Sequence, residues 1–452
     1  MTGSARAIAA ALRPAGLGAA LLAALLLLAV PAAAGVKIQR VTAGGIEAWL
    51  VEDHTNPIIA VRVAFRGSGT AADPAEKGGL ARMASGLLDE GAGELDSQAF
   101  QARLQDLAIS LSFDAGLDDF GGSLQTLSQN RDEAFRLLRL ALTRPRFDPE
   151  PVARIRSQLQ AGLRRDAEDP ETVASLRLWA ALFPDHPYGR PTDGTEASLG
   201  RIDAADLRAF AAGRLGRDRL ILGVVGDIDA ARLAALLPAT FADLPERSTA
   251  TATPAVRPAT GGAVTVVDMD IPQSAITFAQ AGLKRDDPRF YALTVLNQIL
   301  GGHGLTSRLF EEVREQRGLV YSVGTGLVPL DHSALILGNA GTANERVGET
   351  IAVIREQWRR FAERGATDAE LADSKTFLTG SFALRFAGSG RLAGLLASIQ
   401  LQNLGIDYLD RRNALIEAVS NEDVGRLARE LLTPDALRFV VVGRPQGLTP
   451  PR

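Results

Sequence analysis

Apolar positions along the chain follow two spacings, which predict strands followed by helices in each half. Residues 58–65 (IIAVRVAF), 110–118 and 275–280 carry the dense or alternating apolar pattern of strands. Helical spacing is found in residues 78–88, 131–141, 151–165, 289–300 and 307–316. Because strands precede runs of helices and do not alternate with them one by one, the order predicts an α+β fold. Each sheet is expected to be mostly antiparallel, with helices packed on one face.

The chain repeats one plan twice. Residues 202–227 (IDAADLRAFAAGRLGRDRLILGVVGD) align without a gap on residues 419–444 (VSNEDVGRLARELLTPDALRFVVVGR), and each segment predicts an amphipathic helix followed by a strand. A second match pairs Leu80, Met83, Leu87 and Gly91 with Leu293, Leu296, Leu300 and Gly304. Such self-similarity predicts two homologous domains that arose by internal duplication.

A linker is predicted between the two repeats. Residues 245–263 (PERSTATATPAVRPATGGA) are rich in Pro, Thr, Ala and Gly and lack apolar periodicity. They divide the chain into an N-terminal domain, residues 35–244, and a C-terminal domain, residues 264–452. Two domains also agree with the length of 452 residues, because single hydrophobic cores rarely grow beyond about 250 residues.

The first 34 residues have the pattern of a secretory signal peptide. Arg6 and Arg13 precede an apolar run over residues 15–30, and the sequence Pro-Ala-Ala-Ala follows at 31–34. We expect export, most consistent with the periplasm, cleavage after Ala34 and no membrane span in the mature chain. An uncleaved anchor helix is the alternative, although the run is shorter than the ~20 residues that a span prefers.

Charge and cysteine content exclude several classes of function. The formal net charge is −4, from 49 basic and 53 acidic residues spread along the chain, which disfavours nucleic acid as a partner. Cysteine is absent. A thiolate nucleophile, a sulfur-ligated metal and a disulfide framework are therefore all excluded.

Several glycine-containing stretches resemble one known family. They are residues 65–69 (FRGSG), 77–81 (KGGLA), 186–191 (HPYGRP), 301–310 (GGHGLTSRLF) and 313–322 (VREQRGLVYS). On these residues the chain resembles the insulinase/pitrilysin-like zinc metallopeptidase family, and within it the two-domain subgroup similar to the mitochondrial processing peptidase. The resemblance covers nearly all of the mature chain and implies two homologous α+β halves.

The zinc motif of active family members is missing from this sequence. Those members carry His-x-x-Glu-His after a Gly-Leu-Ala sequence, and the two His bind zinc while the Glu activates the metal-bound water. Here residues 82–86 are RMASG, so Arg82, Ser85 and Gly86 occupy the degenerate zinc-motif positions. The third ligand of the family, a Glu on a later helix, also has no counterpart, since residues 151–167 contain no Glu.

No other catalytic constellation replaces this motif. The four histidines are His54, His186, His303 and His332, and no two are one helical turn apart. Each is expected to be a surface or loop side chain, and Gly-x-Ser-x-Gly is absent. The neighbouring carboxylates at 118–119 and 311–312 are expected to be solvated surface groups. The sequence therefore predicts no catalytic residue and no metal ligand of its own.

The resemblance assigns substrate binding to Arg308 and Tyr321. In related proteases an Arg and a Tyr of the second half hydrogen-bond the peptide backbone, which a guanidinium fork and a phenol can do without recognising side chains. From spacing alone, Arg308 could instead pair with Glu311 or Glu312, and Tyr321 could be a half-buried strand aromatic. Arg314 and Arg317 are weaker candidates, since they fit helix-surface charges.

These expectations together imply a non-catalytic, peptide-binding subunit. It would bind no cofactor itself and would form a heterodimer or larger complex with a zinc-bearing catalytic subunit of the same family, whose zinc-bound water attacks the peptide. The alternative is a structural scaffold subunit with no role in proteolysis, as found among zinc-less relatives in respiratory assemblies. A third interpretation, an active peptidase with an unorthodox site, is the least favoured by the residues.

Overall fold

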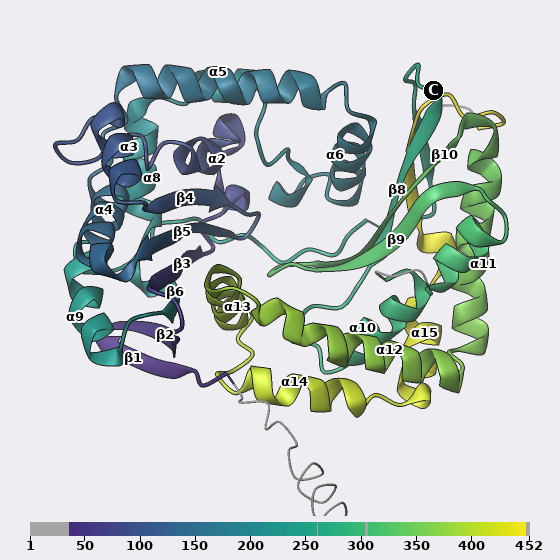
Figure 1. Cartoon of the computed structure of the whole chain (residues 1–452). Coiled ribbons are helices and arrows are strands. Elements are labelled where there is room, and N and C mark those ends of the chain that lie inside the picture. The colour runs from purple at the N-terminus through teal and green to yellow at the C-terminus, as the bar shows by residue number, and fades with distance from the viewer. Residues whose placement is uncertain (1–35, 260, 303–305, 449–452) are drawn as a thin grey trace, which may run out of the picture. The chain divides into compact units, whose positions relative to one another are not determined.

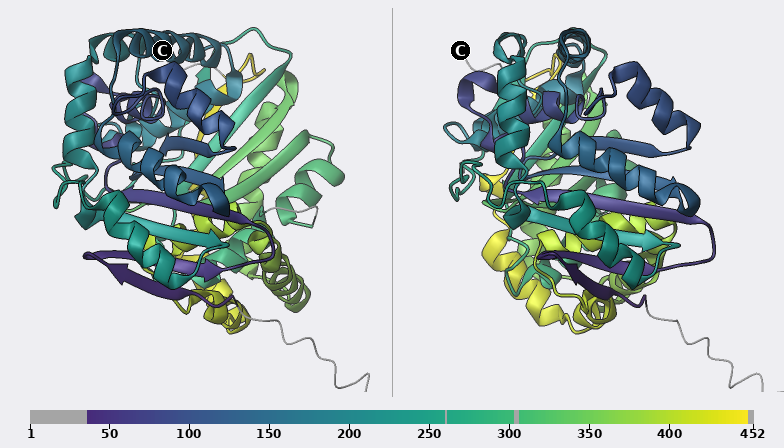
Figure 2. Two further views of the ribbon diagram at one scale, coloured as in Figure 1. Left: turned by 60° about the vertical axis from the view of Figure 1, so that its left-hand side comes forward. Right: turned by 90° about the vertical axis from the view of Figure 1, so that its left-hand side faces the viewer.

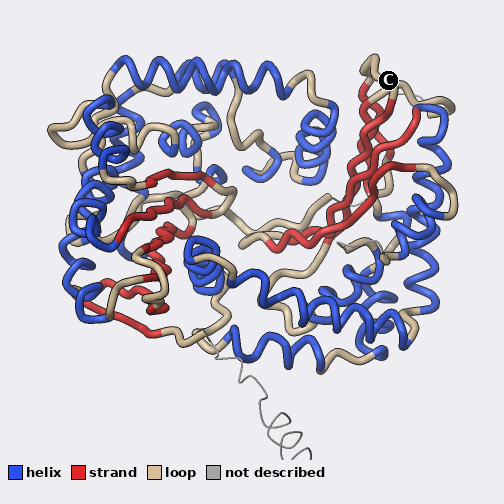
Figure 3. The backbone as a smooth tube through the Cα atoms, in the orientation of Figure 1, coloured by secondary structure: helices blue, strands red, loops and turns tan. Residues whose placement is uncertain are grey.

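The computed structural model describes residues 36–259, 261–302 and 306–448. The predicted signal peptide and His303 lie outside the described residues. The strands gather in two separate sheets, drawn in red in Figure 3. Strands of the first sheet come from before residues 245–263 and strands of the second from after them, whereas the predicted domain boundaries themselves stay a prediction.

The first sheet has six strands in the order β1-β2-β6-β3-β5-β4. Only the pair β2 and β6 is parallel, and the other neighbours are antiparallel. The strands are β1 Gln39–Ala43, β2 Ile46–Glu52, β3 Ile58–Arg66, β4 Ser110–Ala115, β5 Asp119–Leu127 and β6 Leu220–Gly226.

The second sheet repeats this plan with five strands in the order β7-β11-β8-β10-β9. Here β7 and β11 are parallel and the other pairs antiparallel. The strands are β7 Val264–Val267, β8 Gln273–Ala281, β9 Val320–Pro329, β10 Ala334–Ala343 and β11 Arg438–Val442. The predicted α+β class and the internal duplication are confirmed by this shared topology.

Helices lie between the strands of each half, and the last strand of each sheet in chain order, β6 or β11, comes after a run of helices (Figure 1). In the first half they are α2 Leu80–Ser85, α3 Ser97–Asp106, α4 Arg131–Thr143, α5 Pro149–Asp166, α6 Pro170–Leu182, α7 Glu196–Arg201, α8 Ala204–Arg214 and α9 Ala230–Phe241. In the second they are α10 Phe290–Leu300, α11 Val347–Arg364, α12 Asp368–Gly380, α13 Ser389–Leu401, α14 Tyr408–Glu417 and α15 Asn421–Leu431. In the turned views of Figure 2, α4 and α9 lie over the outer face of the first sheet, where α9 contacts β1 and β2.

The expected helix-covered face of each sheet is present, and a further helix also packs on part of the opposite face. Along β11, Phe439 and Val441 belong to the core under α10, α11 and α15, while Val440 and Val442 point into a second cluster with α6. Alternate residues of β11 therefore belong to different cores, because successive side chains along a strand point to opposite faces of the sheet. The dense apolar runs in β3 and β11 are typical of strands covered on both sides.

The second cover of each sheet comes from the other half of the chain. Helix α6 of the first half contacts β8 and β11 of the second sheet, and helix α13 of the second half contacts β3 and β6 of the first (Figure 1). Both helices have 13 residues. At Gly223 of β6 an added Cβ would lie 2.4 Å from the Ala393 carbonyl oxygen, so a glycine permits the close approach of α13. The two halves therefore exchange equivalent helices.

Two predicted helices differ from expectation. Residues 78–88 form a helix only over Leu80–Ser85, and tight turns follow from Gly86. Residues 307–316 contain a π-helix, η6, over Phe310–Glu315, in which Gln316 N–H donates to Glu311 C=O at 2.9 Å. This i to i−5 bonding is rare and is concentrated at functional sites.

Candidate functional site

The degenerate zinc-motif positions lie on α2, whose N-terminus is fixed by a buried ion pair. Asp73 accepts a hydrogen bond from Ala81 N–H and pairs with Arg214 at 2.7 Å. Both side chains are almost fully buried. The helix that would carry the zinc ligands in an active relative is therefore well ordered here.

The side chains at these positions do not fit a zinc ion. Arg82 pairs with Asp193 at 3.2 Å, and Ser85 donates its hydroxyl back to the Arg82 carbonyl oxygen. An added Cβ at Gly86 would lie 3.3 Å from the Ile155 side chain of α5, which occupies the space where a histidine would project. Among the described residues no group of three or more His, Cys, Asp or Glu is placed to hold a metal ion.

The three described histidines make other contacts. His54 contacts Asp227 at 2.7 Å in an exposed pair, and this hydrogen bond raises the pKa of His54. His186 is buried, where its ring accepts Tyr188 N–H and contacts the Pro254 carbonyl oxygen. His186 therefore lies in a loop, as expected, but its ring is buried and not at the surface.

A cavity of about 770 Å³ lies between α6 of the first half and strands β8, β9 and β10 of the second. Its lining includes Thr172 and Ser175 from α6, and Arg314 from η6. Strand β9 is the edge of its sheet, so part of its backbone is unpaired and available to a further strand. At Thr325 this edge is already covered, because Thr325 N–H donates to the Gly301 carbonyl oxygen at 2.6 Å.

Arg314 and Tyr321 stand together beside this cavity. The Arg314 guanidinium lies 5.3 Å from the centre of the Tyr321 ring and 4.7 Å from that of Phe310. Tyr321 is 81% exposed, which excludes the half-buried strand aromatic considered above. A guanidinium and a phenol that share one exposed site offer several N–H and O–H donors to a peptide carbonyl.

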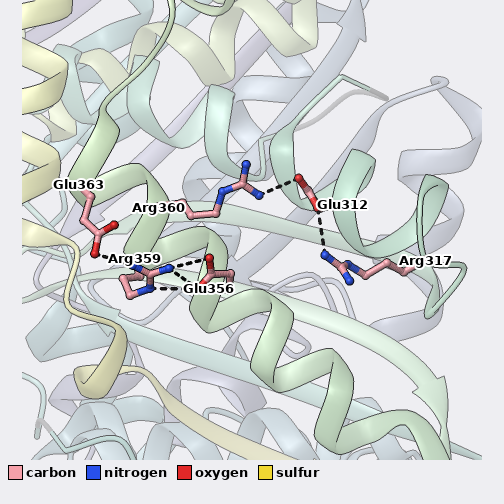
Figure 4. Close-up of polar contacts among 6 residues, drawn as sticks. All are labelled: Glu312, Arg317, Glu356, Arg359, Arg360 and Glu363. Carbon is pink, nitrogen blue, oxygen red and sulfur yellow. Dashed lines mark hydrogen bonds and ion pairs between the residues drawn. The ribbon is translucent and has the colours of Figure 1, made fainter.

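A charged network anchors η6, the helix that carries Arg314. Glu312 pairs with Arg360 of α11 at 2.9 Å and with Arg317 at 3.5 Å (Figure 4). The preceding residue on α11, Arg359, pairs with Glu356 and Glu363, and these groups are well exposed. Only the Glu312 part of the network therefore links α11 to the π-helix. The adjacent carboxylates at 311–312 are not equivalent surface groups.

Arg308 is held in a different environment. Its guanidinium makes two hydrogen bonds to the Glu370 carboxylate at 2.6 and 2.8 Å, donates to the Gly365 carbonyl oxygen and stacks on the Phe361 ring at 4.3 Å. Burial alone would raise the pKa of Glu370, but hydrogen bonds from Arg308 and Thr367 N–H lower it to about 2. Arg308 as a substrate-binding residue stays a prediction, and its ion-pair partner is Glu370, not Glu311 or Glu312.

Asp118 links the two halves, and neither Asp118 nor Asp119 is a simple solvated surface group. Asp118 accepts the Tyr188 hydroxyl at 2.5 Å and the Asp331 N–H at 3.0 Å. The same Tyr188 oxygen accepts His332 N–H from the β9–β10 turn at 3.1 Å. Burial raises the pKa of Asp119 to about 6, although Arg62 opposes the shift. The adjacent aspartates thus lie at a junction between the sheets.

Arg314 is a stronger candidate for substrate binding than its sequence position indicated. It was expected to be a helix-surface charge, yet it lines the cavity and contacts Tyr321. The available signal was its place in the same family-like VREQRGLVYS stretch as Tyr321. Within the described part of the chain, no helix is both long and apolar enough to span a bilayer.

The fold and the cavity together define a class of protein. It is a duplicated α+β protein with a cavity of about 770 Å³ between its halves and with zinc-motif positions that carry no imidazole or carboxylate. Residues 201–378 match the family model described as the Peptidase M16 inactive domain. The non-peptidase homolog YmxG of Helicobacter pylori is 29% identical over 336 residues, covering 74% of this chain and 77% of that relative. An uncharacterized zinc protease of Mycobacterium bovis is 32% identical over 271 residues, covering 59% of this chain and 61% of that relative. The match to this mycobacterial relative thus spans less than two thirds of its length.

Solved structures agree with these sequence matches. The crystal structure of a peptidase M16 inactive domain from Pseudomonas fluorescens has a TM-score of 0.85 and 28% identity, and the match covers 92% of this chain and all of that one. A chain of complex III from Candida albicans has a TM-score of 0.74 at 17% identity, covering 91% of this chain and 96% of that one, which shows a shared fold alone. The resemblance to the insulinase-like M16 peptidase family, and to its inactive members, is confirmed.

Proposed function

We propose that this chain is an exported, non-catalytic, peptide-binding subunit of a heteromeric zinc metallopeptidase. Its partner would be an M16-family subunit that carries His-x-x-Glu-His and holds the zinc. This chain would bind no zinc, because Arg82, Ser85 and Gly86 supply no imidazole or carboxylate and Ile155 packs against α2. The match to the inactive domain model supports the non-catalytic part of the proposal.

The observation that carries the proposal is the Arg314 and Tyr321 pair beside the 770 Å³ cavity. A peptide in extended form can lie along the uncovered part of β9, with its backbone carbonyl groups facing these donors. Hydrogen bonds to the peptide backbone make few contacts with the substrate side chains. We therefore expect this chain to bind peptides of many different sequences. The partner's zinc-bound water would attack the peptide held in this way.

Direct binding tests the proposal. An N-terminally fluorescein-labelled dodecapeptide is titrated with the purified chain, and fluorescence anisotropy gives its affinity. We expect Arg314→Gln and Tyr321→Phe each to weaken binding by roughly tenfold, since each removes hydrogen bonds to the peptide. Arg359→Gln, an exposed arginine on α11, serves as the matched control and should bind normally.

The alternative outcomes are distinct. No measurable binding by the wild-type chain, or equal binding by all variants, contradicts the peptide-binding role. If the chain also forms a stable complex with a zinc-bearing relative while binding no peptide, the scaffold alternative is supported instead.

A further inference from the structure

A second cavity, of about 400 Å³, lies among α10, α12, α13 and α14. Its volume falls within the roughly 300–1,000 Å³ of small-molecule pockets. One side is apolar, with Leu378, Phe382, Leu395 and Ile399 in its lining. It shares Gly302, Thr325 and Gly326 with the lining of the 770 Å³ cavity, so the two cavities adjoin.

The polar side of this second cavity is positively charged. Arg285 and Arg412 both line it, and its lining contains no Asp or Glu among the described residues. Arg412 lies 4.0 Å from the Phe382 ring centre and donates to the Leu378 carbonyl oxygen. Arg285 donates to the Tyr408 hydroxyl at 3.0 Å, and Arg412 lies about one helical turn after Tyr408 on α14.

Arg285 is held in place by contacts with aromatic residues, while two of its guanidinium nitrogens make no hydrogen bond to the described residues. It stacks on the rings of Phe290 and Tyr291 at 4.4 and 4.9 Å, and its Nη2 donates to the hydroxyl oxygens of Tyr291 and Tyr408 at 3.0 Å each. The Nη1 and Nε atoms of Arg285 make no hydrogen bond to the described residues. No carboxylate of the described residues lies within ion-pair distance of the Arg285 guanidinium. Pre-ordering of this kind lowers the entropy cost of binding an anion, and a guanidinium edge matches a carboxylate in two hydrogen bonds.

Two further polar atoms on lining residues lack partners. Asn297 Oδ1 and Thr325 Oγ1 are buried and have no hydrogen bond among the described residues. Both residues are more than nine-tenths buried. Buried polar groups are normally hydrogen-bonded, so a ligand with an N–H group next to its anion would satisfy an acceptor that the protein leaves open.

We propose that this cavity holds the C-terminal end of a bound peptide, with its carboxylate on Arg285 and an apolar last side chain against the α12–α13 wall. The inference rests on the proposed peptide-binding function and names the part of the substrate that this chain recognises. Because the cavity adjoins the larger one, the preceding residues of the peptide continue toward Arg314 and Tyr321.

The test compares the labelled dodecapeptide ending in leucine as a free acid and as a C-terminal amide. We expect the acid to bind the wild-type chain roughly tenfold more tightly than the amide. The chain carries a net charge of −4, so non-specific electrostatics would favour the amide instead. Arg285→Gln should abolish the preference, and Tyr408→Phe, which removes one hydroxyl that positions Arg285, should reduce it.

The controls separate this inference from the function on which it rests. Arg289→Gln changes an exposed arginine of the same segment, which pairs with Asp287 and Glu430, and should keep the preference. Equal binding of acid and amide overturns the inference and leaves peptide binding intact, whereas binding of neither overturns the proposed function itself. If N-acetyl-leucine binds in an Arg285-dependent way by saturation-transfer NMR while acid and amide peptides bind equally, the cavity holds small free carboxylic acids and the peptide assignment is wrong.

Discussion

At the scale of single residues, Arg308 and Arg314 show that environment decides what an arginine can do. Both follow the glycine turn that starts at Gly301. The Arg308 guanidinium donates to Glu370 and to the Gly365 carbonyl oxygen, whereas Arg314 lines the larger cavity. An arginine already bound in two hydrogen bonds to a carboxylate must lose that pairing before it can hold a peptide. Arg308 is therefore expected to stabilise the fold.

Replacement of Arg308 tests this difference. Arg308→Ala should lower the free energy of unfolding by about 1–3 kcal/mol, because it leaves the partly buried Glu370 carboxylate without its main partner. Peptide affinity should stay within twofold of wild type. Urea unfolding measures the stability, and the anisotropy titration measures the peptide affinity. A stable Arg308→Ala variant that no longer binds peptide would show that Arg308 itself binds the substrate.

The sequence could indicate that Arg308 forms an ion pair but not with which residue. Spacing offered Glu311 and Glu312, one turn away, whereas the partner Glu370 lies at the start of α12 and is brought near only by the fold. The alternative of a half-buried strand aromatic for Tyr321 is right about the strand and wrong about the burial, because Tyr321 lies on the edge strand β9 and is 81% exposed. The spacing of residues along the chain therefore predicts neither the Arg308–Glu370 pair nor the exposure of Tyr321.

At the scale of elements, the π-helix η6 is the least predictable feature of the site. Its apolar spacing resembles that of an α-helix, and the change to i−5 hydrogen bonds depends on packing against β9 and α11. The Glu312–Arg360 pair links this short helix to α11, whereas the Glu312–Arg317 pair is local to the end of η6. The position of Arg314 thus depends on residues that never touch the cavity.

Loss of the Glu312 anchor should therefore weaken peptide binding indirectly. We expect Glu312→Gln to lower peptide affinity by about threefold to tenfold, because η6 and its Arg314 become less ordered. Glu356→Gln, which breaks an exposed pair with Arg359 on the same α11, is the matched control and should bind as wild type does. Equal affinities for both variants would show that η6 needs no such anchor.

At the scale of the whole described chain, the central feature is the exchange of α6 and α13 between the halves. The repeat, the two sheets and the α+β class could be predicted from the sequence, because duplication and periodicity are properties of the residues themselves. The additional helix on the opposite face of each sheet could not be predicted, because α6 and α13 come from the other half of the chain and reach these strands only through the fold.

The exchange makes each half depend on the other for stability. Gly223→Ala should destabilise the chain by about 1–3 kcal/mol, because its Cβ would meet the Ala393 carbonyl oxygen of α13 at 2.4 Å. Gly341→Ala in β10, where an added Cβ has no neighbour within 4 Å, is the control. Calorimetry should give one cooperative transition for all variants. Two separate transitions would show that the halves fold independently.

The central claim is that this chain binds peptide for a partner and does not cut peptide itself. The most direct measurement is the rate of peptide hydrolysis by the purified chain alone, by a His-x-x-Glu-His-bearing relative that co-purifies with it, and by the two mixed, each with and without a chelator. The account predicts no hydrolysis by the chain alone and chelator-sensitive hydrolysis in the mixture that falls about tenfold with Arg314→Gln. Chelator-sensitive hydrolysis by the chain alone would contradict it.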